Sequence, residues 1–188
     1  MVLEKTPICE FGKKANNFEL KSTEGKLFSL ENIQGENGLL IMFICNHCPY
    51  VVSTIEDIVR TSKELKKHKI NSIAIMSNDP TEYKDDSFEN MILFAKKYNF
   101  DFPYVIDQDQ SIGKKYDAIC TPDFFGFNSK LELQYRGRIY ELNNSVRPRV
   151  RAENSENELL DSMIEIAKTG KGPEDQIPSM GCSIKWFK

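Results

Sequence analysis

Two strongly apolar runs, each followed by an amphipathic pattern, dominate the hydrophobic profile of the chain. Residues 39–44 and 70–76 are almost continuously apolar over the length of a buried strand. Residues 51–65 and 88–98 instead place apolar side chains every three or four positions, which predicts two helices with one buried face each. The resulting order of strand, helix, strand and helix favours parallel strands joined by a right-handed crossover.

The second half of the chain adds shorter elements. Residues 103–106 are typical of a strand, and residues 112–116 are typical of a short helix. Two apolar segments, 124–127 and 131–136, flank the turn-forming residues 128–130, so we expect an antiparallel hairpin there. Together these elements predict an α/β fold with a mixed central β-sheet flanked by helices on both faces.

Segments near the two ends complete the predicted domain. Residues 1–35 alternate weakly around a turn, so we expect an N-terminal β-hairpin extension at the edge of the core. A last helix is predicted to begin with a capping box formed by Ser155 and Glu158 and to end at Gly170. No linker divides residues 1–188, which we therefore treat as a single domain.

The C-terminal tail, residues 171–188, ends in apolar residues despite its prolines. Ile184, Trp186 and Phe187 favour a tail docked on the domain over free disorder. Cys182 lies in this segment, and the tail is long enough to reach any site on a domain of this size. Cys182 is therefore a candidate additional redox cysteine.

Composition and charge exclude several classes of function. The apolar fraction of 40% and the charged fraction of 28% are ordinary for a globular protein. A net charge of −3 gives no electrostatic reason to expect binding to nucleic acid or to an anionic membrane. No apolar run is long enough to cross a bilayer, and the N-terminus lacks an apolar signal core. We therefore expect a cytoplasmic location.

Two of the five cysteines, Cys45 and Cys48, lie three positions apart, between the first strand and its helix. Free backbone N–H groups and the dipole at a helix N-terminus lower the pKa of such thiols. We expect Cys45 to be the more exposed and to attack a disulfide, Cys48 to resolve the intermediate, and His47 to stabilise a thiolate. A structural metal site is the alternative, but it needs four ligands and no second pair is present, so we predict no metal and no other cofactor.

Five segments carry a resemblance to a known family. They are Gly12-x-x-Ala-x-x-Phe-x-Leu20, Phe43-Ile-Cys-Asn-His-Cys-Pro-Tyr-Val51, Cys120-Thr-Pro-Asp-Phe-Phe125, Tyr135-Arg-Gly-Arg-Ile139 and Pro178-Ser-Met-Gly-Cys-Ser-Ile-Lys-Trp186. Through these segments the chain resembles the thioredoxin-like superfamily over nearly its whole length. Within it, the chain is similar to the AhpC/TSA (redoxin) family, and to a peroxiredoxin-like group that carries a Cys-x-x-Cys motif.

The resemblance implies a thioredoxin-like fold and a substrate-binding loop at Thr121 and Pro122. In the family, the proline that matches Pro122 is cis and faces the cysteine pair. The resemblance therefore implies that the backbone of Thr121 is free to pair with a bound peptide, which would add a strand to the sheet.

The chain departs from peroxiredoxins at two places. If Cys48 matches their peroxide-attacking cysteine, Cys45 occupies the position at which they have threonine. Their catalytic arginine should fall near residues 120–125, where this chain has none. Arg136 and Arg138 lie further on and are expected to be surface or hairpin residues. Efficient peroxidase chemistry is therefore disfavoured.

These departures favour a thiol–disulfide oxidoreductase in cell redox homeostasis, with Cys45 attacking and Cys48 resolving. Residues 38–44 also lack the buried acid that thioredoxins carry before their cysteine pair, so proton handling must differ. Two alternatives remain: an antioxidant thiol peroxidase in which Cys48 reacts with peroxide and condenses with Cys45 or Cys182, and a non-catalytic redox sensor or binding module. The expected partners are a disulfide-containing protein or small molecule and an external thiol reductant.

Overall fold

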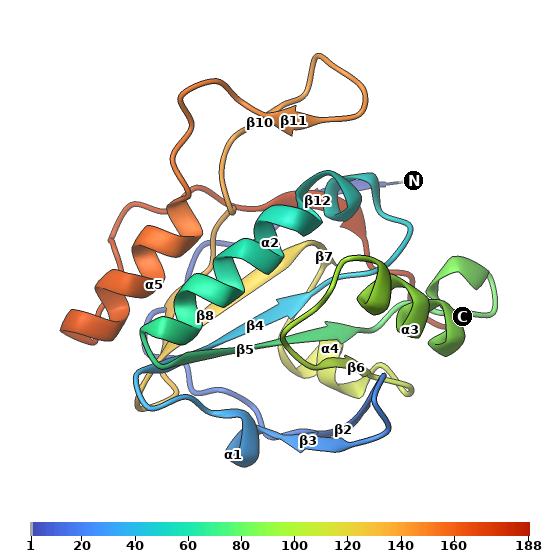
Figure 1. Ribbon diagram of the computed structural model, residues 1–188, viewed down its shortest axis with the longest axis horizontal. Helices are drawn as coiled ribbons and strands as arrows, with labels where there is room; N and C mark the ends of the chain where they lie inside the picture. The colour runs from blue at the N-terminus through green and yellow to red at the C-terminus, as the bar shows by residue number, and fades with distance from the viewer. Residues whose placement is uncertain (1) are drawn as a thin grey trace.

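A seven-stranded mixed sheet forms the centre of the computed structural model, which describes residues 2–188 (Figure 1). Its order is β3 (Leu27–Ser29), β2 (Glu19–Ser22), β6 (Tyr104–Ile106), β5 (Ile70–Met76), β4 (Gly38–Phe43), β8 (Asp123–Asn128) and β9 (Leu133–Tyr135). The three central strands, β4, β5 and β6, are parallel to one another. The β2–β3 hairpin joins one edge antiparallel to β6, and the β8–β9 hairpin joins antiparallel to β4.

The side chains of β4 alternate between two hydrophobic cores, one on each face of the sheet. Leu40 and Met42 belong to one core, and Leu39 and Ile41 belong to the other. All six residues of β4 are buried, because the strand is covered on both faces. This double burial explains why β4 is a continuous apolar run rather than an alternating one.

Helices cover both faces of the sheet, as predicted. α2 (Pro49–Lys67), α3 (Phe88–Lys97) and α5 (Glu158–Thr169) contribute to one core, and α1 (Leu30–Ile33) and α4 (Ser111–Lys115) contribute to the other. In Figure 1, α2 and α5 lie side by side in front of the sheet. Among residues 2–188, no helix combines the length and hydrophobicity needed to cross a membrane. The α/β fold class with a mixed sheet is confirmed.

The predicted cap of the last helix is wrong, although its predicted end is confirmed. The N-cap of α5 is Asn157, whose side chain accepts a hydrogen bond from the backbone N–H of Leu160. Ser155 lies two residues earlier, where its hydroxyl accepts from the N–H of Glu141 and is not available to the helix. Gly170 ends α5 with a φ of 76°, a left-handed conformation that glycine adopts without steric cost.

A second, small sheet joins the two ends of the chain to the body. Its order is β1 (Leu3–Lys5), β12 (Met180–Ser183) and β7 (Cys120–Thr121), all antiparallel. β12 belongs to the C-terminal tail and lies between a strand from the N-terminal end and a strand that leads directly into β8. The tail is thereby held by backbone pairing on both sides.

A two-stranded arm, β10 (Leu142–Asn143) and β11 (Val150–Arg151), extends away from the body at the top of Figure 1. Its return segment contacts the start of α2, because the guanidinium carbon of Arg149 lies 3.9 Å from the centre of the Tyr50 ring. Before the arm, the hydroxyl of Tyr140 donates to Asp57 of α2 at 2.7 Å. These contacts place the arm and its base beside the N-terminal half of α2.

Candidate active site

Cys45 and Cys48 lie at the corner where β4 ends and α2 begins. Cys45 follows the last residue of β4 by two positions, and Cys48 is the N-cap of α2. Pro49 occupies the first helical position, which suits proline because the N–H it lacks would have no partner there. Cys45 is 1% exposed and Cys48 is 0% exposed. Both cysteines are therefore buried, and the exposed position expected for Cys45 is not found, because residues of β7 and β12 cover the corner.

Cys48 is the thiol in this group that ionises most easily. Its Sγ lies 3.1 Å from the carbonyl oxygen of Thr121, to which the protonated thiol donates, and 3.1 Å from the Sγ of Cys182. Hydrogen bonds from the thiols of Cys182 and Cys45 hold the pKa of Cys48 well below its usual range, and the backbone N–H of Val51 lowers it further. Burial acts in the opposite direction but is outweighed.

The two neighbouring thiols have raised pKa values. For Cys45 the main cause is burial, followed by its hydrogen bond to Cys48 and by the negative charge of Asp86. For Cys182 the main cause is its hydrogen bond to Cys48, followed by burial. The Sγ of Cys45 also lies 3.3 Å from the hydroxyl oxygen of Thr121. The arrangement therefore favours ionisation at Cys48, with Cys45 and Cys182 as its protonated neighbours.

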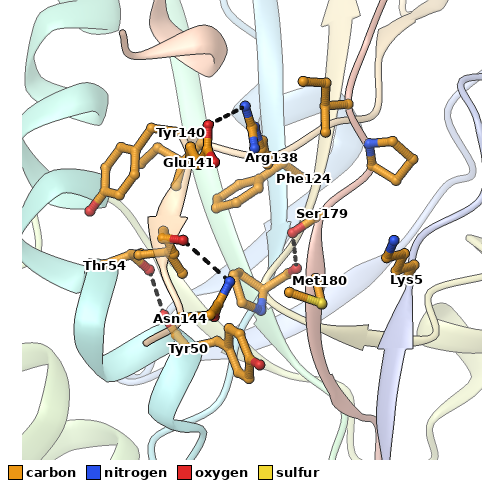
Figure 2. Close-up of a pocket in the computed structure, with 15 residues that line it drawn as sticks. Lys5, Tyr50, Thr54, Phe124, Arg138, Tyr140, Glu141, Asn144, Ser179 and Met180 are labelled. Atoms are coloured by element: carbon orange, nitrogen blue, oxygen red, sulfur yellow. Dashed lines mark hydrogen bonds and ion pairs between the residues drawn. The ribbon is translucent and has the colours of Figure 1, made fainter. Parts of the chain in front are cut away.

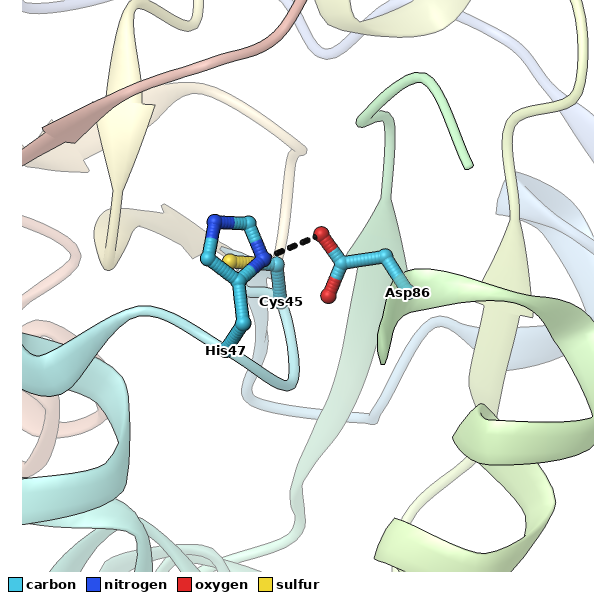
Figure 3. Close-up of side chains that lie close together, drawn as sticks. All are labelled: Cys45, His47 and Asp86. Atoms are coloured by element: carbon cyan, nitrogen blue, oxygen red, sulfur yellow. Dashed lines mark hydrogen bonds and ion pairs between the residues drawn. The ribbon is translucent and has the colours of Figure 1, made fainter. Parts of the chain in front are cut away.

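His47 is paired with a buried carboxylate that the sequence did not reveal (Figure 3). Its Nδ1 lies 2.7 Å from Oδ2 of Asp86, which ends the short 3₁₀ helix η1 (Lys84–Asp86) and is 0% exposed. Asp86 also accepts from the backbone N–H of Asn46 and the side-chain amide of Asn78, each at 2.8 Å. The bond to Asp86 raises the pKa of His47, and the imidazole stacks on the Tyr83 ring at 4.9 Å.

The other nitrogen of His47, Nε2, is buried and has no hydrogen-bond partner within residues 2–188. Because Nδ1 is committed to Asp86, Nε2 is the atom through which His47 could exchange a proton. The negative charge at Cys48 contributes to the raised pKa of His47, so the two groups interact electrostatically. His47 thus belongs to the same electrostatic environment as the cysteine pair.

Cys45, His47 and Asp86 bring three potential ligand atoms within 4.8 Å of one another. However, His47 and Asp86 already bond to each other, and the Cys45 thiol contacts Thr121. A closed structural zinc site needs a fourth ligand. We assign no metal to this cluster.

The Thr121–Pro122 peptide is cis, as the family resemblance implies. The backbone of Thr121 is nevertheless not free to receive a peptide, so that expectation is wrong. β12 occupies this position, with Cys182 directly opposite Thr121 in the antiparallel register. Gly181 makes this contact sterically feasible, because a Cβ at that position would overlap the carbonyl oxygen of Thr121.

Arg136 is buried, which corrects its expected place on the surface. It is 2% exposed and forms an ion pair with the fully buried Asp123 at 2.9 Å. Burial raises the pKa of Asp123 to about 6, and the Arg136 guanidinium counteracts this shift. Arg136 also donates to the carbonyl oxygen of Asp117 at 2.7 Å. Arg138 is only partly exposed and pairs with Glu158 at 2.7 Å. Both arginines are therefore engaged in structural ion pairs.

A cavity of about 220 Å³ opens beside the cysteine corner (Figure 2). Its walls come from the first turns of α2, the cis-proline loop, the base of the arm and the tail just before and within β12. Tyr50, Pro122, Phe124, Tyr140 and Met180 supply apolar surface, and Arg138 and Glu141 form an ion pair in its wall. The cavity can accept an apolar side chain next to the catalytic corner.

Comparison with known proteins places the chain in a family. The family model for AhpC/TSA matches residues 11–139, so the chain belongs to the AhpC/TSA family. An uncharacterised conserved protein from Geobacillus kaustophilus has a crystal structure that covers 100% of this chain and 97% of that one, with 35% identity and a TM-score of 0.89.

A curated relative and a distant structure add to this placement. The thiol-disulfide oxidoreductase ResA of Bacillus thuringiensis subsp. konkukian is 29% identical over 119 residues, which are 62% of each chain. The present chain thus spans less than two thirds of the length of that relative. A thiol:disulfide interchange protein of the thioredoxin family from Chlorobium tepidum has a TM-score of 0.57 at 17% identity, over 66% of this chain and 84% of that one. The fold is thioredoxin-like.

Proposed function

We propose that this protein is a thiol–disulfide oxidoreductase that reduces disulfides in cell redox homeostasis. The observation that carries the proposal is the position of Cys48 at the N-cap of α2, between the thiols of Cys45 and Cys182, whose hydrogen bonds lower the pKa of Cys48 and favour its thiolate. The thiolate is the form that attacks disulfides. The cis-proline loop beside it and the thiol-disulfide oxidoreductase relatives support the same chemistry.

The pKa directions favour the opposite order of attack from the one predicted from the sequence. The sequence predicts that Cys45 attacks and Cys48 resolves, whereas the structure raises the pKa of Cys45 and lowers that of Cys48. We therefore propose that the Cys48 thiolate attacks one sulfur of the substrate disulfide, forming a mixed disulfide and releasing the other sulfur as a thiolate. A second cysteine then attacks Cys48 and releases the reduced substrate.

His47 is proposed to supply the proton that the released thiolate needs. Its pKa is raised by Asp86, so a larger fraction of the imidazole is protonated near neutral pH than for an exposed histidine. The Nε2 atom is available for the transfer, because Nδ1 is held by Asp86. This pair takes the place of the strand-borne acid that the sequence lacks.

The substrate class we propose is a disulfide-containing protein or small molecule, with an external thiol as the reductant. The cavity beside Pro122 supports a peptide substrate, because it can receive an apolar side chain that flanks the substrate cysteine. The net charge of −3 offers no attraction to nucleic acid or to anionic membranes. We propose a cytoplasmic location, where glutathione and thioredoxin keep thiols reduced.

A peptide-disulfide reduction assay with dithiothreitol as the external reductant tests the proposal. The wild-type protein should accelerate reduction over dithiothreitol alone, and Cys48→Ser should abolish the acceleration. Cys9→Ser, which removes a partly exposed cysteine outside the corner, is the matched control and should retain it. No acceleration by the wild-type protein would reject the oxidoreductase and leave a thiol peroxidase, a redox sensor or a binding module.

A thiol peroxidase is the second candidate, because the lowered pKa falls on Cys48, the cysteine at the peroxide-attacking position. The arginine that would polarise the peroxide is not supplied by Arg136, which is paired with Asp123. Stopped-flow mixing with hydrogen peroxide separates the two functions. A rate constant no better than that of a small free thiol would reject the peroxidase.

A further inference from the structure

A sulfur from the other end of the chain lies against the candidate nucleophile. Cys182 Sγ lies 3.1 Å from Cys48 Sγ, although the two residues are 134 positions apart in the sequence. A disulfide needs the two sulfur atoms about 2.05 Å apart, so they must approach by only about 1 Å. Cys182 is 4% exposed, which means that its position faces the corner rather than solvent.

The strand that carries Cys182 occupies the place where a substrate strand would add to the fold. β12 pairs with β7 so that Cys182 is opposite Thr121, the residue before the cis-proline. On its other side β12 pairs with β1, with Leu3 opposite Cys182. Cys182 therefore presents its sulfur to Cys48 as the cysteine of a bound peptide would.

The residues immediately before Cys182 help to fix the position of β12. Gly181 is the neighbour of Cys182, and a side chain there would collide with the carbonyl oxygen of Thr121. Just before the strand, the hydroxyl of Ser179 donates to the carbonyl oxygen of Pro122 at 2.8 Å. These features hold the tail against the cis-proline loop immediately before the cysteine.

From this juxtaposition we propose that Cys182 is the resolving cysteine, so that each turnover closes a Cys48–Cys182 disulfide. The assignment rests on the proposed function. In the mixed disulfide, the Cys182 thiolate attacks Cys48 Sγ, the new Cys48–Cys182 bond forms, and the bond from Cys48 to the substrate breaks. The substrate leaves as a thiolate and takes up a proton. Two electrons pass from the protein thiols to the substrate, and the external thiol restores them.

The charges around the two candidate resolving cysteines support this choice. Lys185 and Arg149 act to lower the pKa of Cys182, whereas Asp86 acts to raise the pKa of Cys45. Formation of the mixed disulfide removes the negative charge at Cys48, which is a cause of the raised pKa in both neighbours. Cys182 then has cations beside it and Cys45 has an anion, so Cys182 loses its proton more readily.

Single-turnover trapping with oxidised glutathione tests the assignment. Reduced Cys9→Ser, Cys9→Ser/Cys45→Ser and Cys9→Ser/Cys182→Ser proteins are mixed with oxidised glutathione, quenched with acid and mapped by mass spectrometry. The first two should end as the Cys48–Cys182 disulfide. The Cys182→Ser protein should stall with glutathione on Cys48, with a lifetime about tenfold longer or more. Cys182→Ala serves as a second variant and should stall in the same way.

This experiment distinguishes a failure of the Cys182 assignment from a failure of the proposed function. If Cys182→Ser and Cys182→Ala release glutathione at the control rate and form a Cys45–Cys48 disulfide, the assignment of Cys182 is overturned and the oxidoreductase stands. If no protein that retains Cys48 is glutathionylated faster than Cys9→Ser/Cys48→Ser, the proposed function itself fails, and the assignment of Cys182 fails with it.

Discussion

The two thiols that neighbour Cys48 meet charges of opposite sign. The carboxylate of Asp86 acts to raise the pKa of Cys45, and both groups are buried. The cations of Lys185 and Arg149 act to lower the pKa of Cys182. Hydrogen bonds from both thiols lower the pKa of Cys48 and so favour its thiolate.

This difference shows why sequence spacing alone does not assign roles in a Cys-x-x-Cys motif. The partner that is adjacent in the sequence, Cys45, lies beside a negative charge that opposes its ionisation. The partner that is distant in the sequence, Cys182, lies beside positive charges that favour it. These charges act in addition to burial and to the hydrogen bonds with Cys48, and they favour ionisation of Cys182 over ionisation of Cys45.

Neutralising Asp86, the carboxylate that raises the pKa of Cys45, should have the largest effect of the three substitutions. Asp86→Asn removes a carboxylate that accepts hydrogen bonds from Asn46, Asn78 and His47, and should lower the free energy of unfolding by about 1–3 kcal/mol. It should also lower the pKa of Cys45. Urea denaturation and the thiolate absorbance near neutral pH measure the two effects. Asp85→Asn changes the exposed neighbour and is the control; an equal effect of both substitutions would contradict the account.

Removing the charge of Lys185, one of the cations that lower the pKa of Cys182, should have an intermediate effect. Lys185→Met preserves the length of the side chain but removes a charge that lowers the pKa of Cys182. Resolution of the Cys48 mixed disulfide should slow by about three- to tenfold, since one pKa unit changes the thiolate fraction tenfold. Rapid-quench mass spectrometry gives the rate. Lys188→Met, at an exposed lysine paired with Glu82, should leave it unchanged. If Lys185→Met resolves the mixed disulfide at the wild-type rate, the charge of Lys185 does not assist resolution.

Substitution of His47 should have the smallest effect and a characteristic pH dependence. The folded-state pKa of His47 is raised above its unfolded value of 6.5, so its contribution to stability is complete below pH 6.5 and is lost as the pH rises through the folded-state pKa. His47→Gln should therefore destabilise the protein more at pH 5.5 than at pH 8. Urea denaturation at both pH values measures this, with the exposed His68→Gln as control. A loss of stability that is larger at pH 8 than at pH 5.5 would contradict this prediction.

Sequence patterns predicted the elements that depend on local or repeated apolar spacing. The continuous run of β4, the helical spacing of α2 and the hairpin around residues 128–130 all appear where expected. Gly170 was predictable because a left-handed helix end strongly favours glycine. Cys45 and Cys48 were recognisable because two cysteines three positions apart, at a strand-to-helix corner, are typical of a redox pair.

Features that depend on pairs distant in the sequence were not predictable. Asp86 meets His47 across 39 positions, and no local pattern marks one of many acids as buried. Arg136 was expected at the surface because an isolated charge usually is exposed, and only its contact with Asp123 explains its burial. β1 and β7 have three and two residues, too few to show an alternating pattern. Without β1 and β7, the sequence indicates that the tail is long enough to reach the cysteine pair, but it does not indicate where the tail lies.

The most direct test of the central claim, that Cys48 holds the attacking thiolate, is the initial burst of reaction with Ellman's disulfide. All proteins carry Cys9→Ser, and the buried Cys120 is retained throughout. A protein with Cys45→Ser and Cys182→Ser, which keeps only Cys48 of the three thiols at the corner, should show a burst of one equivalent at neutral pH. Cys48→Ser, which keeps the other two, should show none. A burst that survives in Cys48→Ser and disappears in the double variant would contradict the account.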